Sequence, residues 1–289
     1  MLSPTKKGPL CLAVLLFQFT CNPSQFFWKK QMKKLRKRSR GVTCYIVLAT
    51  AQPKCDVPPM FWCLNDALAA RCGVIEECEA YKNWNQNKPV QLTLLYESFC
   101  PFSRQMIISA INGSLHTFAT NQLQAEFVPW GNARLLPNGT IQCQHGPEEC
   151  ILNKFESCAI FYLKPVWQFI VCLEDQIKYQ PLDQVKQYCY KKVGVTKTNQ
   201  DKIGSCAAGE LGNRLQMQAY NQTSAVVPDK HRFVPWLVLD GYSFEPLQPM
   251  VIDQPPDVLE SLVCLLHRGN PPSACKQVLL KKLNRLMML

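Results

Sequence analysis

The chain has 289 residues, 47% of them hydrophobic, which is enough for one medium-sized domain with a substantial core. Its net charge of +11 comes from the first 51 residues, which carry ten Lys or Arg and no acidic residue. The rest of the chain holds 22 basic and 21 acidic residues. This balance argues against the basic surface of a nucleic-acid-binding protein, so we expect no nucleic acid partner.

Two short apolar runs, residues 10–19 and 41–51, lie in this basic leader, and both are too short to span a bilayer comfortably. The second follows a basic stretch and ends in Ala49-Thr50-Ala51, a small-x-small cleavage site. We therefore interpret residues 1–51 as a leader whose signal peptide proper is 32–51, with targeting effectively starting at Met32. Cleavage leaves a mature chain that begins at Gln52 and has no stable membrane span. A signal-anchor made of the first run is the alternative.

Residues 52–88 form a cysteine-rich segment and a polar stretch. Cys55, Cys63, Cys72 and Cys78 are spaced by seven, eight and five residues, and Trp62 precedes the second of them. This pattern resembles the short saposin A-type segment of saposin precursors, which implies a propeptide-like module; a generic disulfide-pinned loop is the alternative. The polar residues 82–88 predict a linker. The main domain is expected over 89–276, with a C-terminal tail at 277–289.

A thiol–disulfide motif opens the main domain. Cys100-Pro101-Phe102-Ser103 has the form C-x-x-C with serine in place of the second cysteine. It follows a predicted strand, Pro89–Tyr96, and begins a predicted helix that runs to about Asn121 with a break at Asn112-Gly113. A thiolate at a helix N-terminus is stabilised by the helix dipole, which makes Cys100 a nucleophile. Ser103 can donate a hydrogen bond to that thiolate but cannot form a disulfide.

The remaining elements complete an α/β order. A strand is predicted at Ala125–Trp130, followed by a loop to Ile141, and a final helix at Val258–His267. Between them we expect helices in 147–220 and then a strand with a tight turn at Asp240-Gly241; these segments are Cys158–Glu174, Asp183–Lys191, Cys206–Asn221 and the strand His231–Asp240. The order predicts a thioredoxin-like fold with a disulfide-braced helical insertion.

Pro235 lies inside an apolar strand-like run, where proline is disfavoured unless it has a role. In thioredoxin-like folds a cis proline precedes the third core strand and lies against the active-site cysteine, and Pro235 occupies that place in the predicted order. Pro129 is instead expected to end its strand.

Cysteine parity points to one free thiol. Cys11, Cys21 and Cys44 fall in the leader, and thirteen cysteines remain, an odd number. If Ser103 replaces a cysteine, Cys100 is free and the others can form six disulfides; an unpaired buried cysteine elsewhere is the alternative. The expected disulfide cysteines are Cys55, Cys63, Cys72, Cys78, Cys143, Cys150, Cys158, Cys172, Cys189, Cys206, Cys264 and Cys275. Abundant cysteine, with glycosylation sequons at Asn112, Asn138 and Asn221, favours an oxidising secretory compartment.

Residues 143–158 carry a specific pattern, C-Q-H-G-x2-E-C-x2-N-x4-C. It resembles the signature of the gamma-interferon-inducible lysosomal thiol reductase family, GILT, at every fixed position, and the resemblance extends over roughly 89–276. The resemblance implies a thioredoxin-like reductase of disulfides in endocytosed proteins, sorted to the lysosome through its glycans. The family has C-x-x-C, so Cys100 matches its nucleophile and Ser103 departs from it.

Two functions follow, with a third as the plain alternative. The chain is a monothiol oxidoreductase acting on protein disulfides with a small thiol as reductant, located in the lysosome or outside the cell. Alternatively it is a thiol trap or escort that retains clients through Cys100, or a structural domain with a decayed site. No cofactor is expected. A metal site at Cys143, His145 and Cys150 is disfavoured because an oxidising compartment places the cysteines in disulfides, and His145 is expected to be a structural hydrogen-bonding residue.

Overall fold

The structure is a computed structural model that describes residues 35–39, 42–46, 55, 57–253 and 257–278. The chain forms two compact units, residues 1–52 and 53–289. In the first unit, β1 (Leu35–Ser39) and β2 (Val42–Ile46) pair antiparallel. The rest of the leader, including the cleavage site after Ala51, lies outside the described residues, so its processing stays a prediction.

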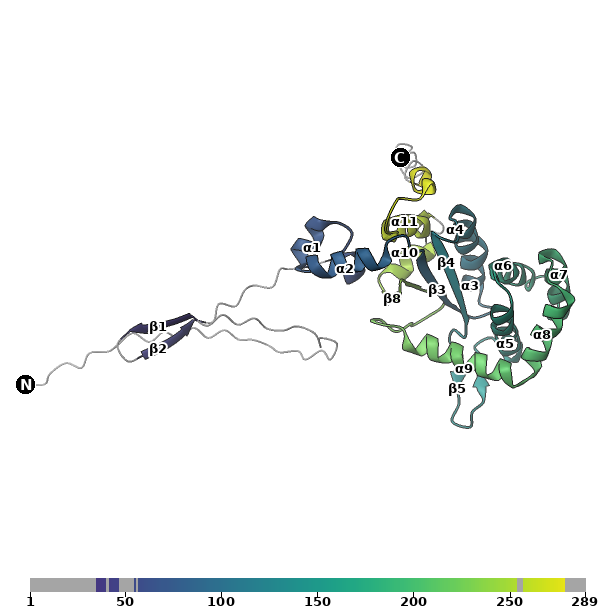
Figure 1. The fold of residues 1–289 in the computed structure, drawn as a ribbon. Helices are drawn as coiled ribbons and strands as arrows, with labels where there is room; N and C mark the ends of the chain where they lie inside the picture. The colour runs from purple at the N-terminus through teal and green to yellow at the C-terminus, as the bar shows by residue number, and fades with distance from the viewer. Residues whose placement is uncertain (1–34, 40–41, 47–54, 56, 254–256, 279–289) are drawn as a thin grey trace, which may run out of the picture. The chain divides into compact units, whose positions relative to one another are not determined.

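A four-stranded sheet in the order β4-β3-β7-β8 organises the second unit (Figure 1). The central strand β3 (Val90–Tyr96) pairs parallel with β4 (Leu123–Pro129) and antiparallel with β7 (Trp236–Leu239). Five residues of β3 and all four of β7 are buried, as expected for strands covered on both faces. The strand predicted over His231–Asp240 is shorter than expected. Its first residues form a loop that ends at the cis Val234–Pro235 bond.

The crossover from β3 to β4 is one helical column: α3 (Pro101–Met106), the π-helical turn η2 (Ile107–Ile111) and α4 (Asn112–Thr117). The break predicted at Asn112-Gly113 is wrong, since the helix runs through both residues and the irregular turn precedes them. Gly113 weakens a helix by about 1 kcal/mol. The burial of Ile107, Ala110 and Ile111 in the core outweighs that loss.

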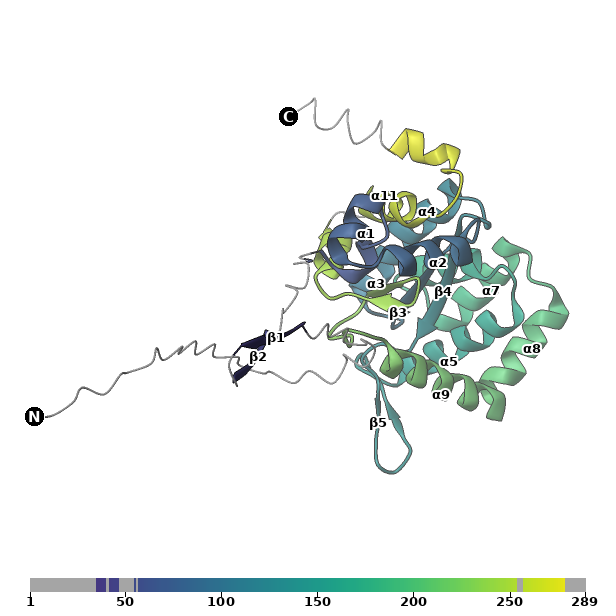
Figure 2. The same cartoon turned by 60° about the vertical axis from the view of Figure 1, so that its left-hand side comes forward.

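Five helices fill the predicted insertion, grouped at one end of the fold and away from α11 in both views (Figures 1 and 2). Two predicted helices are each split: 158–174 at the cis Lys164–Pro165 bond and 206–221 at Gly209. Disulfides Cys158–Cys206 and Cys172–Cys189 join the first helix to the fourth and the second to the third. The helices are α5 (Pro147–Tyr162), α6 (Trp167–Gln176), α7 (Leu182–Val193), α8 (Lys197–Ala208) and α9 (Glu210–Ala225).

Two hairpins flank the insertion. β5 (Arg134–Leu135) and β6 (Ile141–Gln142) form a protruding hairpin within the predicted loop (Figure 1). β7 and β8 (Tyr242–Ser243) are joined by Asp240-Gly241, both at positive φ, the two-residue turn that the sequence predicts. α10 (Leu247–Asp253) was not predicted, and α11 (Asp257–Leu266) is the predicted final helix, tied to the following segment by Cys264–Cys275.

The cysteine-rich segment has its own small core. It contains η1 (Pro59–Phe61), α1 (Asp66–Cys72) and α2 (Ile75–Asn85), pinned by Cys55–Cys72 and Cys63–Cys78. The predicted linker 82–88 is half helix, because α2 continues to Asn85. The backbone N–H of Asn87 then donates to the carbonyl of Arg268 (3.0 Å). The saposin A-type resemblance and the boundary at residue 88 stay predictions. Among the described residues, no helix combines the length and apolar character needed to cross a membrane.

Candidate active site around Cys100

Cys100 caps the N-terminus of α3, directly after a turn that follows β3. Its carbonyl accepts the backbone N–H of Arg104 (3.0 Å), and Pro101 occupies the first helical position, which suits its fixed φ. Phe99 adopts φ +69°, an uncommon conformation for a residue with a Cβ. This turn buries the Cys100 side chain, leaving 6% of the residue exposed. Cys100 is free, and the twelve other cysteines between residues 55 and 278 are paired.

The loop before β7 supplies the wall opposite the thiol. The Cys100 Sγ donates to the backbone carbonyl of Val234 at 3.9 Å, and the bond from Val234 to Pro235 is cis. The pairing of β3 with β7, with Leu95 opposite Trp236, brings this loop beside Cys100. The structure thus places Cys100 and Pro235 together, and it places Pro129 at the end of β4.

Gln248 of α10 fixes the position of β7. Its Oε1 accepts the backbone N–H of Leu237 (2.8 Å), and its Nε2 donates to the carbonyl of Leu237 (2.9 Å). A fully buried amide therefore satisfies backbone groups that a neighbouring strand would otherwise pair. β7, which follows the wall that faces the thiol, is therefore held by β3 on one side and by Gln248 on the other.

Ser103 occupies the next turn of α3 and is fully buried. Its Oγ makes no hydrogen bond within the described part of the chain. A buried hydroxyl without a partner is destabilising by about 1–3 kcal/mol. No other partner therefore competes for the hydrogen bond that the Ser103 hydroxyl can donate to a Cys100 thiolate.

Residues of the sequence signature hold the turn between β3 and Cys100. Asn153 of α5 accepts hydrogen bonds at Oδ1 from the backbone N–H (2.9 Å) and the Oγ (2.8 Å) of Ser98. The Ser98 hydroxyl also lies 3.4 Å from the carbonyl of Glu149. The N-terminal half of α5 therefore anchors the loop that positions the thiol.

A cluster of Glu97, His145 and Glu149 lies beside the same turn. His145 Nδ1 is 2.6 Å from Glu149 Oε2 and 3.5 Å from Glu97 Oε1, and the backbone N–H of Asn132 donates to Glu97 Oε2 (2.8 Å). Burial raises the pKa of Glu97 above its usual value, while the Asn132 hydrogen bond lowers it. His145 is the hydrogen-bonding residue that the sequence predicts, and it links two fully buried carboxyl groups.

Among the described residues, Glu97, His145 and Glu149 are the one group of possible metal ligands whose donor atoms lie close together, within 4.8 Å of one another. The 2.6 Å contact of His145 with Glu149 is a hydrogen-bond distance. Two ligands of one Zn²⁺ at about 2.0–2.2 Å would lie roughly 3 Å or more apart. The disulfide between Cys143 and Cys150 leaves neither sulfur as a thiolate ligand.

A second pair of buried carboxyl groups comes from α5 and α6. Glu156 and Glu174 are fully buried, and the Tyr96 hydroxyl donates to Glu156 Oε2 (2.8 Å). Burial raises the pKa of Glu156 to about 7, against hydrogen bonds from Tyr96 and Glu174 that lower it. Burial and the charge of Glu156 raise the pKa of Glu174 well above its usual value, and a charge on Cys100 raises it further. The Arg104 Nε donates to the backbone carbonyl of Glu174 (2.7 Å), which ties α3, the helix that begins after Cys100, to α6.

Comparisons with known proteins decide the family. The profile described as "Gamma interferon inducible lysosomal thiol reductase (GILT)" matches residues 91–193. A goldfish (Carassius auratus) gamma-interferon-inducible lysosomal thiol reductase is 35% identical over 243 residues, covering 81% of this chain and 89% of that protein. The chain belongs to the GILT family. An Arabidopsis thaliana gamma-interferon-responsive lysosomal thiol protein is 32% identical, covering 64% of this chain and 75% of that protein. The Mus musculus thiol reductase is 29% identical, covering 66% and 73%.

The residues of the GILT signature therefore also have structural roles. Its cysteines form the disulfides Cys143–Cys150 and Cys158–Cys206, and its His145, Glu149 and Asn153 hold the turn before Cys100. The motifs of the sequence do not by themselves point to the buried carboxyl groups. A signal was available, because Glu149, Asn153 and Glu156 recur at helical spacing on a helix that is otherwise apolar on that face.

The predicted glycosylation sites differ in accessibility. Asn138 is exposed in the β5–β6 turn and Asn221 is exposed on α9. Asn112 is half-buried at the junction of η2 and α4, and the hydroxyl-bearing Ser114 of its sequon is buried. The glycosylation of all three stays a prediction.

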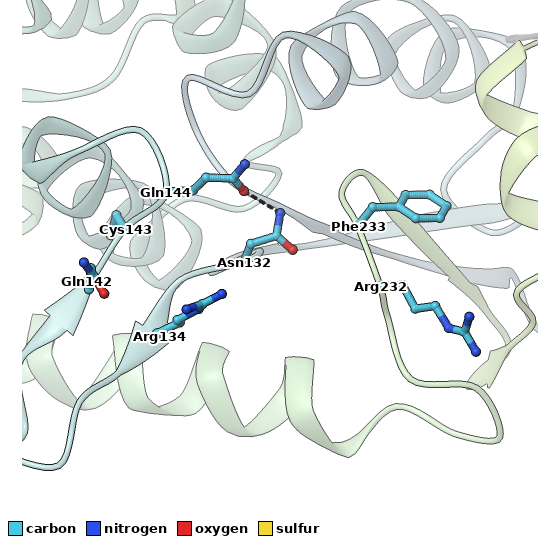
Figure 3. Close-up of a pocket in the computed structure, with 7 residues that line it drawn as sticks. All are labelled: Asn132, Arg134, Gln142, Cys143, Gln144, Arg232 and Phe233. Carbon is cyan, nitrogen blue, oxygen red and sulfur yellow. Dashed lines mark hydrogen bonds between the residues drawn. The ribbon is translucent and has the colours of Figure 1, made fainter.

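A polar cavity opens at the base of the β5–β6 hairpin in this GILT chain (Figure 3). It has a volume of about 610 Å³ and lies between the hairpin and the loop that precedes Pro235. Phe233 of that loop forms part of its wall. The cavity therefore adjoins the wall that faces the Cys100 thiol.

We predict that the folded chain is more stable at acidic pH. The pKa of Glu156 is raised to about 7 in the folded chain and is about 4.3 in an unfolded chain. The contribution of Glu156 to the free energy of unfolding is fully present below about pH 4.3. It is lost as the pH rises through 7, by an amount on the order of a few kcal/mol. Thermal unfolding between about pH 4 and 8 checks this, and Glu156→Gln should flatten the decline. Glu148→Gln, at an exposed site on the same helix, is the control; equal pH profiles for both variants would contradict the assignment.

We predict that Gly131 is required for the packing of Glu97. Gly131 has φ +58°, and an added Cβ would lie 2.5 Å from Glu97 Oε2. Gly139→Ala is a matched control, because Gly139 has φ +82° with no heavy atom within 4 Å of an added Cβ. We expect Gly139→Ala to be destabilising by about 1 kcal/mol and Gly131→Ala by about 2 kcal/mol more, measured by urea unfolding. Equal losses would show that Glu97 adjusts freely.

Proposed function

We propose that this chain is a thiol–disulfide oxidoreductase of the lysosomal or secretory pathway, acting on protein disulfides through Cys100. The observation that carries the proposal is the unpaired thiol of Cys100 at the start of α3, against the Val234 carbonyl and Pro235. Relatives that are 35% and 29% identical are named lysosomal thiol reductases, which supports the same chemistry here. The order of the sheet and the cis proline beside the thiol support a thioredoxin-like fold, which we propose as part of this function.

The chemistry begins when the Cys100 thiolate attacks a client disulfide. A mixed disulfide forms between Cys100 and one client sulfur, and the other client sulfur leaves as a thiolate that takes up a proton. The raised pKa values of the buried Glu156 and Glu174 keep this pair protonated in an acidic compartment, and a charge on Cys100 raises the pKa of Glu174 further. Ser103 can donate a hydrogen bond to the thiolate, since its buried Oγ has no other partner.

The second half of the reaction needs an external thiol. A resolving cysteine would attack from the same helix with a large effective concentration, and a serine hydroxyl cannot replace it. We propose that a small thiol attacks the mixed disulfide instead. The implied partners are disulfide-bonded client proteins, the small thiol and a glycan-sorting receptor, and no nucleic acid.

The second candidate is a thiol trap or escort that keeps its client through Cys100. The burial of the thiol and the absence of a resolving cysteine at Ser103 favour a long-lived mixed disulfide. Turnover in excess small thiol separates the two functions. An enzyme releases reduced client repeatedly, whereas a trap stops after one equivalent.

We predict that Ser103→Cys raises disulfide reduction under limiting external thiol, by roughly tenfold or more, because a thiol at this position resolves the mixed disulfide intramolecularly. Insulin reduction by the wild type and by Ser103→Cys measures the effect. Cys100→Ser in both backgrounds is the control and should abolish activity. Equal rates with and without the Ser103→Cys change would show that position 103 is not the resolving position.

We predict that Cys100 is the one cysteine of the mature chain that an alkylating reagent labels without prior reduction. The physical reason is that the other twelve are paired in disulfides. Mass spectrometry after iodoacetamide treatment at about pH 5 should find one label, at Cys100, and none in Cys100→Ser. A label on any other cysteine would disagree with the six pairs.

A further inference from the structure

The cavity at the base of the β5–β6 hairpin is polar and positively charged. One wall is the hairpin and the other is the loop before β7 (Figure 3). None of its lining residues, all in the described part of the chain, is acidic. The lining residues whose side chains could contact a ligand are Asn132, Arg134, Gln142, Gln144, Arg232 and Phe233.

Arg134 is the cation that is available for a ligand. It is exposed, and it takes part in no ion pair within the described part of the chain. Arg232 is already paired with Glu245 at 3.2 Å. A guanidinium presents a planar fork of donors that matches a carboxylate. The cavity therefore suits a ligand that carries a carboxylate.

The amides give the cavity hydrogen-bonding groups for a peptide-like ligand. The Asn132 Nδ2 donates to Gln144 Oε1 at 2.7 Å, which fixes both side chains at the rim (Figure 3). The Asn132 Oδ1 and the Gln144 Nε2 keep their own hydrogen-bonding capacity. Phe233 adds an apolar wall. A volume of about 610 Å³ falls in the range of small-molecule sites.

The cavity also lies at a suitable distance from the thiol. Phe233 in its wall is bonded to Val234, whose carbonyl is 3.9 Å from the Cys100 Sγ. One residue of chain spans about 3.8 Å, so the wall lies on the order of 10 Å from the sulfur. An extended tripeptide covers a similar length, at about 3.3–3.6 Å per residue.

We infer that this cavity binds the small thiol that resolves the Cys100 mixed disulfide, and that it recognises a carboxylate of that thiol through Arg134. The inference rests on the proposed function and names its co-substrate class: a small peptide thiol that carries carboxylates, as glutathione does. These carboxylates stay ionised at about pH 5, because an α-carboxyl group has a pKa of about 3.3–3.7.

The reaction balances with two such thiols per client disulfide. The first thiol attacks the Cys100 sulfur of the mixed disulfide, forms a disulfide with Cys100 and releases the client as a thiol. The second attacks the small-thiol sulfur of that disulfide and regenerates Cys100. The client disulfide gains two electrons and two protons, and the two small thiols lose them to become their own disulfide.

The kinetic test compares two thiols on the intact secreted protein at about pH 5.5. Glutathione carries carboxylates and cysteamine carries none. We expect Arg134→Ala to raise the KM for glutathione about tenfold, which corresponds to the loss of one charged contact, and to leave the KM for cysteamine within about twofold. Arg134→Lys should recover part of the loss, and Arg214→Ala, at an exposed position on α9, should change neither constant. Equal changes for both thiols would overturn the inference.

The binding test does not depend on turnover. S-methylglutathione has the same carboxylates and no thiol, so it cannot react with Cys100. We expect titration calorimetry to show binding in the millimolar range or tighter, with affinity about tenfold weaker in Arg134→Ala and unchanged in Arg214→Ala. Absence of binding, or equal binding to all variants, would overturn the cavity assignment. Binding that depends on Arg134 without turnover by any thiol would instead count against the proposed oxidoreductase function alone.

Discussion

The contact between the Cys100 thiol and the Val234 carbonyl is the constraint on which the site depends. Both groups leave the sheet from neighbouring strands, and the pairing of Leu95 with Trp236 fixes how far each loop reaches. The Phe99 turn brings the sulfur to the start of α3, and the cis bond before Pro235 presents the carbonyl to it. A shift in the register of β7 would therefore move the thiol's partner, which explains why a buried amide from α10 holds the edge of that strand.

Burial raises the pKa values of three glutamates, Glu97, Glu156 and Glu174, in the folded chain. Glu97 and Glu149 are linked through His145, while Tyr96 donates a hydrogen bond to Glu156. Desolvation disfavours the charged form of a buried carboxyl group, so these groups destabilise the folded state least at low pH, where they are protonated. These three carboxyl groups therefore favour the folded state at acidic pH.

The serine at position 103 divides the chemistry between the protein and its surroundings. In the function that we propose, the protein supplies the attacking sulfur and the carbonyl wall and leaves resolution to a second molecule. The cationic cavity that shares a loop with the carbonyl wall is the place where we infer that this molecule binds. The helical insertion contributes to each part, because α5 anchors the loop before Cys100 and α6 supplies Glu174.

The sequence by itself determined the unpaired cysteine and much of the order of strands and helices, because motif spacing, parity and hydrophobic period can be read from the sequence alone. It did not reveal the break at Pro165 or the helix through Gly113, where proline geometry and core burial competed with helical periodicity. Only the tertiary structure decided which cysteines pair and which side chains meet. Glu97, Glu149 and Glu174 come from three separate parts of the chain, and their burial follows from packing over long sequence distances, which no local pattern encodes.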